Sequence, residues 1–207
     1  MTRADQILPW IQGPSVLDVG CVGSVAVTGY PDWLHRRLHE KGWKVTGLEL
    51  SSAAVERARA LGYDRINVGN AEDFTLADRF DTIVAGELLE HLANPGRFFD
   101  RCREHLLPGG RVVLTTPYAF GLASVLYAGL KFPKTCSNGE HVIWFCPATL
   151  RALGERAGFT VQHWALITDY PAAPGAWGLM TRSFAALDRV LPSRFTRNGL
   201  LFVFTQD

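Results

Sequence analysis

The sequence has little of several features that would assign it to a special class of protein. Its 207 residues carry 21 basic and 20 acidic side chains, for a formal net charge of +1, with no block of like charge. This balance gives no basic surface for a nucleic-acid backbone, which argues against a nucleic-acid partner. The four cysteines show no CxxC spacing, so neither a zinc finger nor a disulfide framework is indicated. We expect a reducing, cytoplasmic environment.

Long hydrophobic runs are also absent. The longest apolar run, from Ala119 to Leu130, is shorter than the roughly 20 residues that a helix needs to span a bilayer. The first residues lack a basic leader followed by a continuous apolar core, so we expect no signal peptide. The run ends near Lys131 and Lys134 and could make peripheral contact with a membrane, although a lid that excludes water is the interpretation we favour.

The chain does have enough apolar residues for one core. Hydrophobic residues make up 47% of the sequence, and the length is too short for two comfortable domains. We therefore expect one domain over residues 1–207, with a lid-like insert at 118–139 and a loop and helix excursion at 168–198. Substrate choice should reside in these two segments, because loops over a fixed sheet are where such folds vary.

Short apolar runs rich in β-branched residues alternate with helical patterns along the chain. The expected strands are residues 15–20, 43–50, 64–69, 80–86, 110–116, 159–167 and 200–206, and the expected helices are residues 33–42, 51–62, 95–110 and 147–158. The helix at 95 has Asn94 as its N-cap, Pro95 in its first position and a Pro-Gly-Gly stop at 108–110. The alternation predicts an α/β fold: a Rossmann-like open sheet of about seven strands, mostly parallel with a final antiparallel strand, and helices on both faces.

Three successive strand ends carry residues suited to an adenosine-containing cofactor. Ligands of such sheets bind beyond the carboxyl ends of the strands. The first strand ends in VLDVGCVGS, where Gly20 and Gly23 allow close approach of a ligand. The second ends with Glu49, which can accept hydrogen bonds from both ribose hydroxyls, and the third ends near Asn70, which could contact an adenine amino group. The turn lacks GxGxxG, which disfavours a nicotinamide-binding domain.

These motifs resemble those of the class I S-adenosylmethionine-dependent methyltransferases, from about Ser15 to the end of the chain. VLDVGCVGS is similar to the family's glycine-rich motif, TGLELS to its ribose motif, GNAEDF to its adenine motif and LLPGGRVVLTTP to its fifth-strand region. Val22 and Ser24 stand where glycine is usual, and Asn70 where aspartate is usual. The resemblance implies S-adenosyl-L-methionine as cofactor, bound by Asp18, Gly20, Cys21, Gly23, Glu49, Leu50, Asn70, Ala71, Glu72 and Gly86.

The stretch AGELLEHLANPG places Glu87, Glu90 and His91 just after the fourth expected strand. If this segment makes one helical turn, positions i, i+3 and i+4 lie on one face. Two carboxylates that close repel each other, and one pKa would rise unless a cation neutralises them. A divalent metal would remove that cost, and His141 could supply a further imidazole from after the fifth strand.

The pattern ExxEH followed by a later histidine resembles two methyltransferase branches. One contains the ubiquinone-pathway O-methyltransferases that act on catechol-like rings, and the other the enzymes that methylate the 2′-hydroxyl at the 3′ end of small RNAs. The resemblance implies a magnesium or manganese ion held by Glu87, Glu90, His91 and His141, and catalytic roles for Glu90, His91 and His141. Alternatively, Glu90 or His91 acts as a base, or orients a loop, without a metal.

Our leading hypothesis is an enzyme that transfers a methyl group to an oxygen of a small-molecule, glycan or lipid-linked acceptor with neighbouring hydroxyls. An RNA 2′-O-methyltransferase shares the metal motif, but the balanced charge disfavours it. A non-catalytic S-adenosylmethionine-binding regulatory protein is a third possibility, disfavoured because the acidic and imidazole groups are intact. N- or C-methylation stays open, because the cofactor motifs are common to all these reactions.

Overall fold

The computed structural model describes residues 2–23, 32–121, 124–125, 129, 139–168 and 196–206. Most of the expected insert at 118–139 and of the expected excursion at 168–198 therefore lies outside the described residues. The elements, in chain order, are α1 (Arg3–Ile7), η1 (Leu8–Trp10), β1 (Ser15–Val19), α2 (Leu34–Glu40), β2 (Lys44–Glu49), α3 (Ser52–Ala60), β3 (Ile66–Val68), β4 (Phe80–Gly86), η2 (Leu89–His91), α4 (Pro95–His105), β5 (Leu106–Pro117), α6 (Pro147–Arg156), β6 (Phe159–Ile167) and β7 (Gly199–Gln206).

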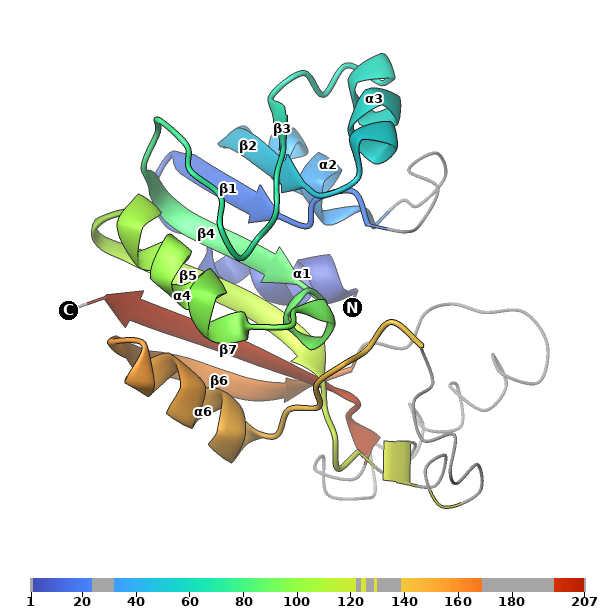
Figure 1. Ribbon diagram of the computed structural model, residues 1–207, viewed down its shortest axis with the longest axis vertical. Helices are drawn as coiled ribbons and strands as arrows, with labels where there is room; N and C mark the ends of the chain where they lie inside the picture. The colour runs from blue at the N-terminus through green and yellow to red at the C-terminus, as the bar shows by residue number, and fades with distance from the viewer. Residues whose placement is uncertain are drawn as a thin grey trace.

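The strands form one seven-stranded sheet in the order β3-β2-β1-β4-β5-β7-β6 (Figure 1). The pairs among β1 to β5 are parallel, and β7 runs antiparallel to both β5 and β6. Helices α4 and α6 lie on one face, and α1 lies behind the sheet on the other. The predicted fold class, a mostly parallel Rossmann-like sheet with a final antiparallel strand, is confirmed.

Each face of the sheet has its own apolar core. On one face, Phe98 and Phe99 of α4 and Leu150 of α6 pack with Leu17 of β1 and Phe204 of β7. On the other, Ile7 and Leu38, from α1 and α2, pack with strand residues one position away from those of the first core, among them Val16, Val84 and Val203. This alternation follows from the two-residue period of a strand. Burial on both faces explains why the strands are almost continuously apolar.

The boundary between α4 and β5 differs from the prediction. Helix α4 begins as expected, with the Asn94 side chain accepting a hydrogen bond from the Arg97 backbone amide at 3.3 Å. It ends at His105, however, five residues before the expected stop at Gly110. Leu106 instead enters the sheet opposite Phe80, and a register shift follows before Arg111 pairs with Thr82. Sheet pairing with a distant strand overrides the local helical pattern here.

The central strands bring distant parts of the chain to one edge of the sheet. Strand β1 is paired with β2 on one side and with β4 on the other, so the strand order reverses at β1. Because these strands are parallel, the residues after Val19, Glu49 and Gly86 emerge at the same carboxyl edge. A ligand site is expected in that crevice. In the part of the chain that the structure describes, no helix is long and apolar enough to cross a membrane.

Gly154 packs closely against the sheet from α6. A Cβ atom at this position would lie 2.2 Å from the Cε1 atom of Phe204, so the helix or the ring would have to move. We expect Gly154→Ala to lower the free energy of unfolding by about 1 to 3 kcal/mol, the usual cost of overpacking. Urea denaturation followed by circular dichroism measures the change.

The matched control is Ala152→Gly, at an exposed position of the same helix. Helix propensity alone predicts that this change costs about 0.5 to 1 kcal/mol, because glycine loses more backbone entropy on folding. If Gly154→Ala instead stabilises the protein by a similar amount, the packing explanation for Gly154 is wrong.

Candidate active site

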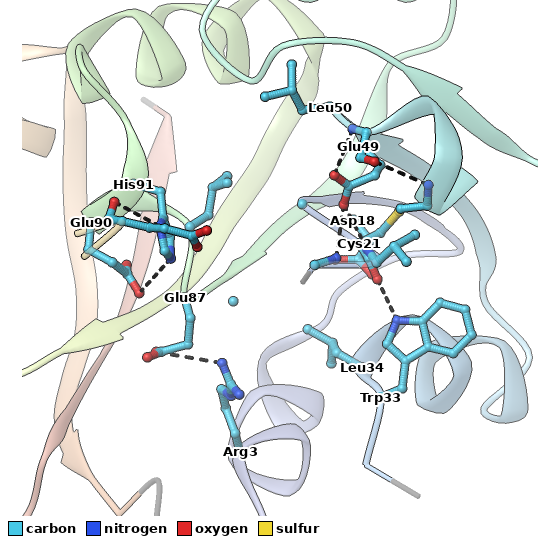
Figure 2. Close-up of a pocket in the computed structure, with 18 of the residues that line it drawn as sticks. Arg3, Asp18, Cys21, Trp33, Leu34, Glu49, Leu50, Glu87, Glu90 and His91 are labelled. Carbon is cyan, nitrogen blue, oxygen red and sulfur yellow. Dashed lines mark hydrogen bonds and ion pairs between the residues drawn. The ribbon is translucent and has the colours of Figure 1, made fainter. Parts of the chain in front are cut away.

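A cleft of about 870 Å³ runs along the carboxyl edge of the sheet (Figure 2). Most of the residues that the sequence pointed to line this cleft: Asp18, Gly20, Cys21, Gly23, Glu49, Leu50, Gly86, Glu87, Glu90, His91 and His141. Asn70, Ala71 and Glu72 are not among its lining residues. They follow β3 at the same edge, where the backbone amide of Gly69 donates a hydrogen bond to the carbonyl of Glu49 at 2.9 Å.

The turn after β1 requires glycine at two positions. Gly20 and Gly23 have φ angles of 72° and 66°, in the left-handed region that a side chain disfavours. The amide of Gly20 donates to the carbonyl of Leu48 at 2.8 Å, which ties this turn to β2. Val22, which stands where the resemblance leads one to expect glycine, is buried, and Ser24 lies outside the described residues.

Glu49 fixes the path of this turn from the end of β2. Its Oε2 atom accepts hydrogen bonds from the backbone amides of Val22 at 3.1 Å and Gly23 at 3.0 Å, and its Oε1 atom accepts one from the amide of Ser51 at 3.1 Å. The carboxylate is nearly buried and lines the cleft. The neighbouring Leu50 is 69% exposed, which places an apolar surface beside the carboxylate.

The side chain of Asn70 forms a hydrogen bond within its own turn. Its side-chain oxygen accepts a hydrogen bond from the amide of Glu72 at 2.9 Å, which closes the turn after β3. The side-chain oxygen of Glu72 in turn accepts a hydrogen bond from the amide of Asn94 at 3.1 Å, which links this turn to the start of α4. The amide oxygen expected to contact a ligand is therefore also a turn-forming acceptor.

Glu87 does not share a face with Glu90 and His91. It adopts a φ of 53°, the only positive φ of a non-glycine residue among the described residues, and its amide donates to the carbonyl of Thr115 at 3.0 Å. The chain therefore changes direction before η2 begins, and the single helical turn expected from position 87 does not form. The Glu87 carboxylate lies 3.9 Å from the guanidinium of Arg3 (Figure 2).

Glu90, His91 and His141 are brought together. One ligand atom from each lies within 4.8 Å of the others, and Glu90 is only 1% exposed. Its Oε2 atom accepts a hydrogen bond from the Thr116 hydroxyl at 2.9 Å, whereas its buried Oε1 atom has no hydrogen-bond partner. The ring of His91 meets that of His141 edge-on, with centroids 4.8 Å apart.

Backbone hydrogen bonds hold the segment that contains His141 beside Glu90, although the two are far apart in the chain. The amides of Val142 and Ile143 donate to the carbonyl of Glu90 at 2.8 and 3.3 Å. The Nδ1 atom of His91 lies 3.2 Å from the carbonyl of Glu140, which accepts from it when Nδ1 carries the proton. That tautomer leaves the Nε2 lone pair, 4.0 Å from Oε1 of Glu90, available as a base or a ligand.

Burial sets the protonation of two members of this cluster. Desolvation raises the pKa of Glu90, although its own backbone amide, the Thr116 hydroxyl and His91 oppose the shift. Burial lowers the pKa of His141, and the nearby charge of His91 lowers it further. Both shifts favour neutral side chains and therefore reduce the cost of holding the cluster out of water.

Arg3 and Trp33 line the cleft but were not expected from the sequence. Arg3 begins α1 and is separated from Glu87 by more than 80 residues, so no local pattern connects the two. Trp33 precedes α2, and its indole nitrogen donates a hydrogen bond to the carbonyl of Cys21 (Figure 2). A tryptophan just before a helix reads equally well as a core residue, so its role depends on the fold.

Comparison with known proteins was consistent with this geometry. Residues 5–164 match the family model described as a methyltransferase domain. Two ubiquinone biosynthesis O-methyltransferases are similar in sequence. The enzyme of Nitrosococcus oceani is 30% identical over 74% of this chain and 66% of its own length. The enzyme of Alkalilimnicola ehrlichii is 29% identical over 67% of this chain and 58% of its own length. The chain thus spans about three fifths to two thirds of the length of these relatives.

The fold also matches solved structures. An S-adenosylmethionine-dependent methyltransferase from Mesorhizobium loti superimposes with a TM-score of 0.69 over 98% of this chain and 95% of its own, at 23% identity. At this identity the likeness shows that the fold is shared. The chain belongs to the methyltransferase-domain family.

Proposed function

We propose that this protein transfers a methyl group from S-adenosylmethionine to an oxygen of a small-molecule, glycan or lipid-linked acceptor that carries neighbouring hydroxyls. One observation carries the proposal: a single cleft has Gly20 and Glu49 at one end and the cluster of Glu90, His91 and His141 at the other. Figure 2 shows Glu49 and Asp18 on one side of the cleft, across from Glu90 and His91. The names of the similar O-methyltransferases support the same reaction class.

The first end suits the nucleoside part of the cofactor. The two carboxylate oxygens of Glu49 already accept hydrogen bonds from three backbone amides, which keeps the group oriented. A carboxylate has about four lone-pair sites, and three are taken by these amides, so one ribose hydroxyl can donate to the site that stays available on Oε1. Leu50 offers its exposed apolar side chain to the adenine ring. Asp18, Cys21 and Gly86 also line the cleft.

The second end fits a divalent metal. A buried carboxylate oxygen without a partner is costly, and a cation would remove that cost. Glu90, His91 and His141 would hold the ion, and Glu87 would join them only if its side chain turned from Arg3. One carboxylate and two imidazoles suit manganese or another first-row ion as well as magnesium. When bound, such an ion lowers the pKa of a nearby hydroxyl and orients vicinal oxygens.

The side chains of this end can also handle the proton of the acceptor. In the transfer, the acceptor oxygen forms a bond to the methyl carbon, the sulfur–methyl bond breaks with its electrons going to sulfur, and the hydroxyl proton leaves. The lowered pKa of His141 keeps its imidazole neutral and able to accept a proton, whereas Glu90, whose pKa burial raises, can accept one only in its ionised form. Transfer requires the acceptor oxygen to lie in line with the methyl group and the sulfur.

Glu49→Gln tests the cofactor end. Replacing the carboxylate by an amide removes a charged acceptor from the ribose hydroxyls, so we expect affinity for S-adenosylhomocysteine to fall by a factor of about 10 to 100. Isothermal titration calorimetry measures the change. Glu56→Gln, on the exposed surface of α3, is the matched control and should leave the affinity unchanged. Equal affinity of wild type and Glu49→Gln would remove Glu49 from the cofactor site.

Metal titration tests the second end. Mn²⁺ or Mg²⁺ titrated into metal-stripped protein saturated with S-adenosylhomocysteine should bind at one site, and Glu90→Gln or His141→Gln should weaken binding roughly tenfold or more. Glu104→Gln and His163→Gln, which alter residues of α4 and β6, serve as matched controls. If the cofactor binds and no metal does, Glu90 and His91 are bases or structural groups, and single hydroxyls and amines become the acceptors to test.

The acceptor class is tested by transfer of a labelled methyl group from S-adenosylmethionine to a panel of simple compounds. We expect methylation of a catechol in preference to the corresponding phenol, because two adjacent oxygens bind a metal ion held by Glu90, His91 and His141 better than one oxygen does. An RNA with a 3′-terminal ribose diol is included in the panel. Preference for this RNA, with strong dependence on salt, would favour the RNA 2′-O-methyltransferase, and transfer to none of the acceptors despite tight cofactor binding would favour a regulatory protein.

A further inference from the structure

Two buried threonines lie near the end of β5, at the carboxyl edge of the sheet. Thr115 and Thr116 are both 0% exposed, and Thr116 pairs with Leu200 of β7. Consecutive residues of a strand point to opposite faces of the sheet. Leu114 belongs to the core beneath α4 and α6, so Thr116 lies on that face and Thr115 on the other. A hydroxyl at such a position is costly unless it forms a hydrogen bond.

The hydroxyl of Thr116 distinguishes the two oxygens of the Glu90 carboxylate. It donates a hydrogen bond to Oε2 at 2.9 Å, where both side chains are almost fully buried. The other oxygen, Oε1, has no hydrogen-bond partner among the described residues and lies 4.0 Å from the Nε2 atom of His91 (Figure 2). One oxygen is therefore held by the sheet, and the other lies toward the imidazole.

The backbone around Glu90 does not by itself fix the orientation of the carboxylate. The amides of Val142 and Ile143 bind the carbonyl of Glu90 and hold its main chain. The last torsion of a glutamate side chain is broad, however, so the plane of the carboxylate can turn over a wide range. The hydrogen bond from Thr116 selects one orientation, because a turn would leave two buried polar groups without a partner.

Side chains that bind a metal ion are usually oriented in this way. Hydrogen bonds from outer groups hold the ligands, and the loss of such a group weakens metal binding. Glu90, His91 and His141 each offer one ligand atom, and these atoms lie within 4.8 Å of one another. His91 has such an outer partner in the carbonyl of Glu140, 3.2 Å from its Nδ1 atom. Thr116 stands in the same relation to Glu90.

We propose that Thr116 is a positioning residue of the metal site: its hydroxyl holds Oε2 of Glu90, so that Oε1 is presented to a divalent ion that His91 and His141 also bind. The inference rests on the proposed metal site. Glu90 then binds the ion through one oxygen, because the bond to Thr116 keeps the second oxygen away. A carboxylate that binds in this way leaves more coordination positions for the neighbouring oxygens of an acceptor.

The test is titration of Mn²⁺ into metal-stripped protein saturated with S-adenosylhomocysteine. Thr116→Val keeps the shape of the side chain and removes the donor, so we expect the affinity for Mn²⁺ to fall by a factor of about 10 to 100. Thr116→Ser keeps the hydroxyl and should restore most of the affinity. The affinity for S-adenosylhomocysteine should not change in either variant. Unchanged Mn²⁺ affinity in Thr116→Val, or a loss that serine does not restore, would overturn the proposal.

Thr115→Val is the matched control. It makes the same substitution one residue away, at an equally buried position on the opposite face, where the hydroxyl has no hydrogen-bond partner in the part of the chain that the structure describes. We expect this variant to bind Mn²⁺ as tightly as the wild type does. Equal losses in Thr115→Val and Thr116→Val would contradict a specific role for the Thr116 hydroxyl.

Wild-type protein gives a second readout if Thr116→Val does not fold. A crystal structure with Mn²⁺ should show one oxygen of Glu90 on the ion and the other on the Thr116 hydroxyl. An ion on both oxygens, or a Thr116 hydroxyl turned from Glu90, would overturn the proposal. If the wild type binds S-adenosylhomocysteine but no metal, the proposed metal site falls and the role of Thr116 falls with it. Equal Mn²⁺ binding by wild type and Thr116→Val removes the role of Thr116 alone.

Discussion

The parallel pairing of β1 with both β2 and β4 is the constraint on which the rest of the site depends. Each strand ends at the same edge, so the turn at Gly20, the carboxylate of Glu49 and the segment after Gly86 meet although they are far apart in the chain. Apolar packing on both faces of the sheet fixes this register, because a slip of one residue would exchange the two cores. Packing in the core therefore also fixes the positions of the residues that line the cleft.

Three carboxylates at this edge are removed from water, and each is supported differently. Glu49 accepts from backbone amides, Asp18 faces a histidine, and Glu90 has one oxygen on the Thr116 hydroxyl and the other without a hydrogen-bond partner. A buried carboxylate costs free energy unless donors or a cation compensate it. This cost is the reason why we propose that a cation binds at Glu90.

Much of the fold could be predicted from the sequence because its signals are local. The seven strands, the N-cap at Asn94 and the glycine turn all follow from residue type and spacing. The end of α4 could not be predicted in this way, because Leu106 leaves the helical pattern only to pair with Phe80 of a different strand. Glu87 could not either: its backbone turns into the left-handed region under constraints from Thr115 and the sheet edge.

The sequence by itself determined that Glu90, His91 and His141 were candidates for one site and that Glu49 was a candidate for ribose binding, since the order of the expected strands and residue chemistry suffice for this. Only the tertiary structure decided which side chains meet. It placed Arg3 beside Glu87, bound the His141 segment to the Glu90 carbonyl, and buried His35 against Asp18. The physical reason is that hydrogen bonds and ion pairs act over a few ångströms, and sequence separation carries no information about such distances until the sheet has formed.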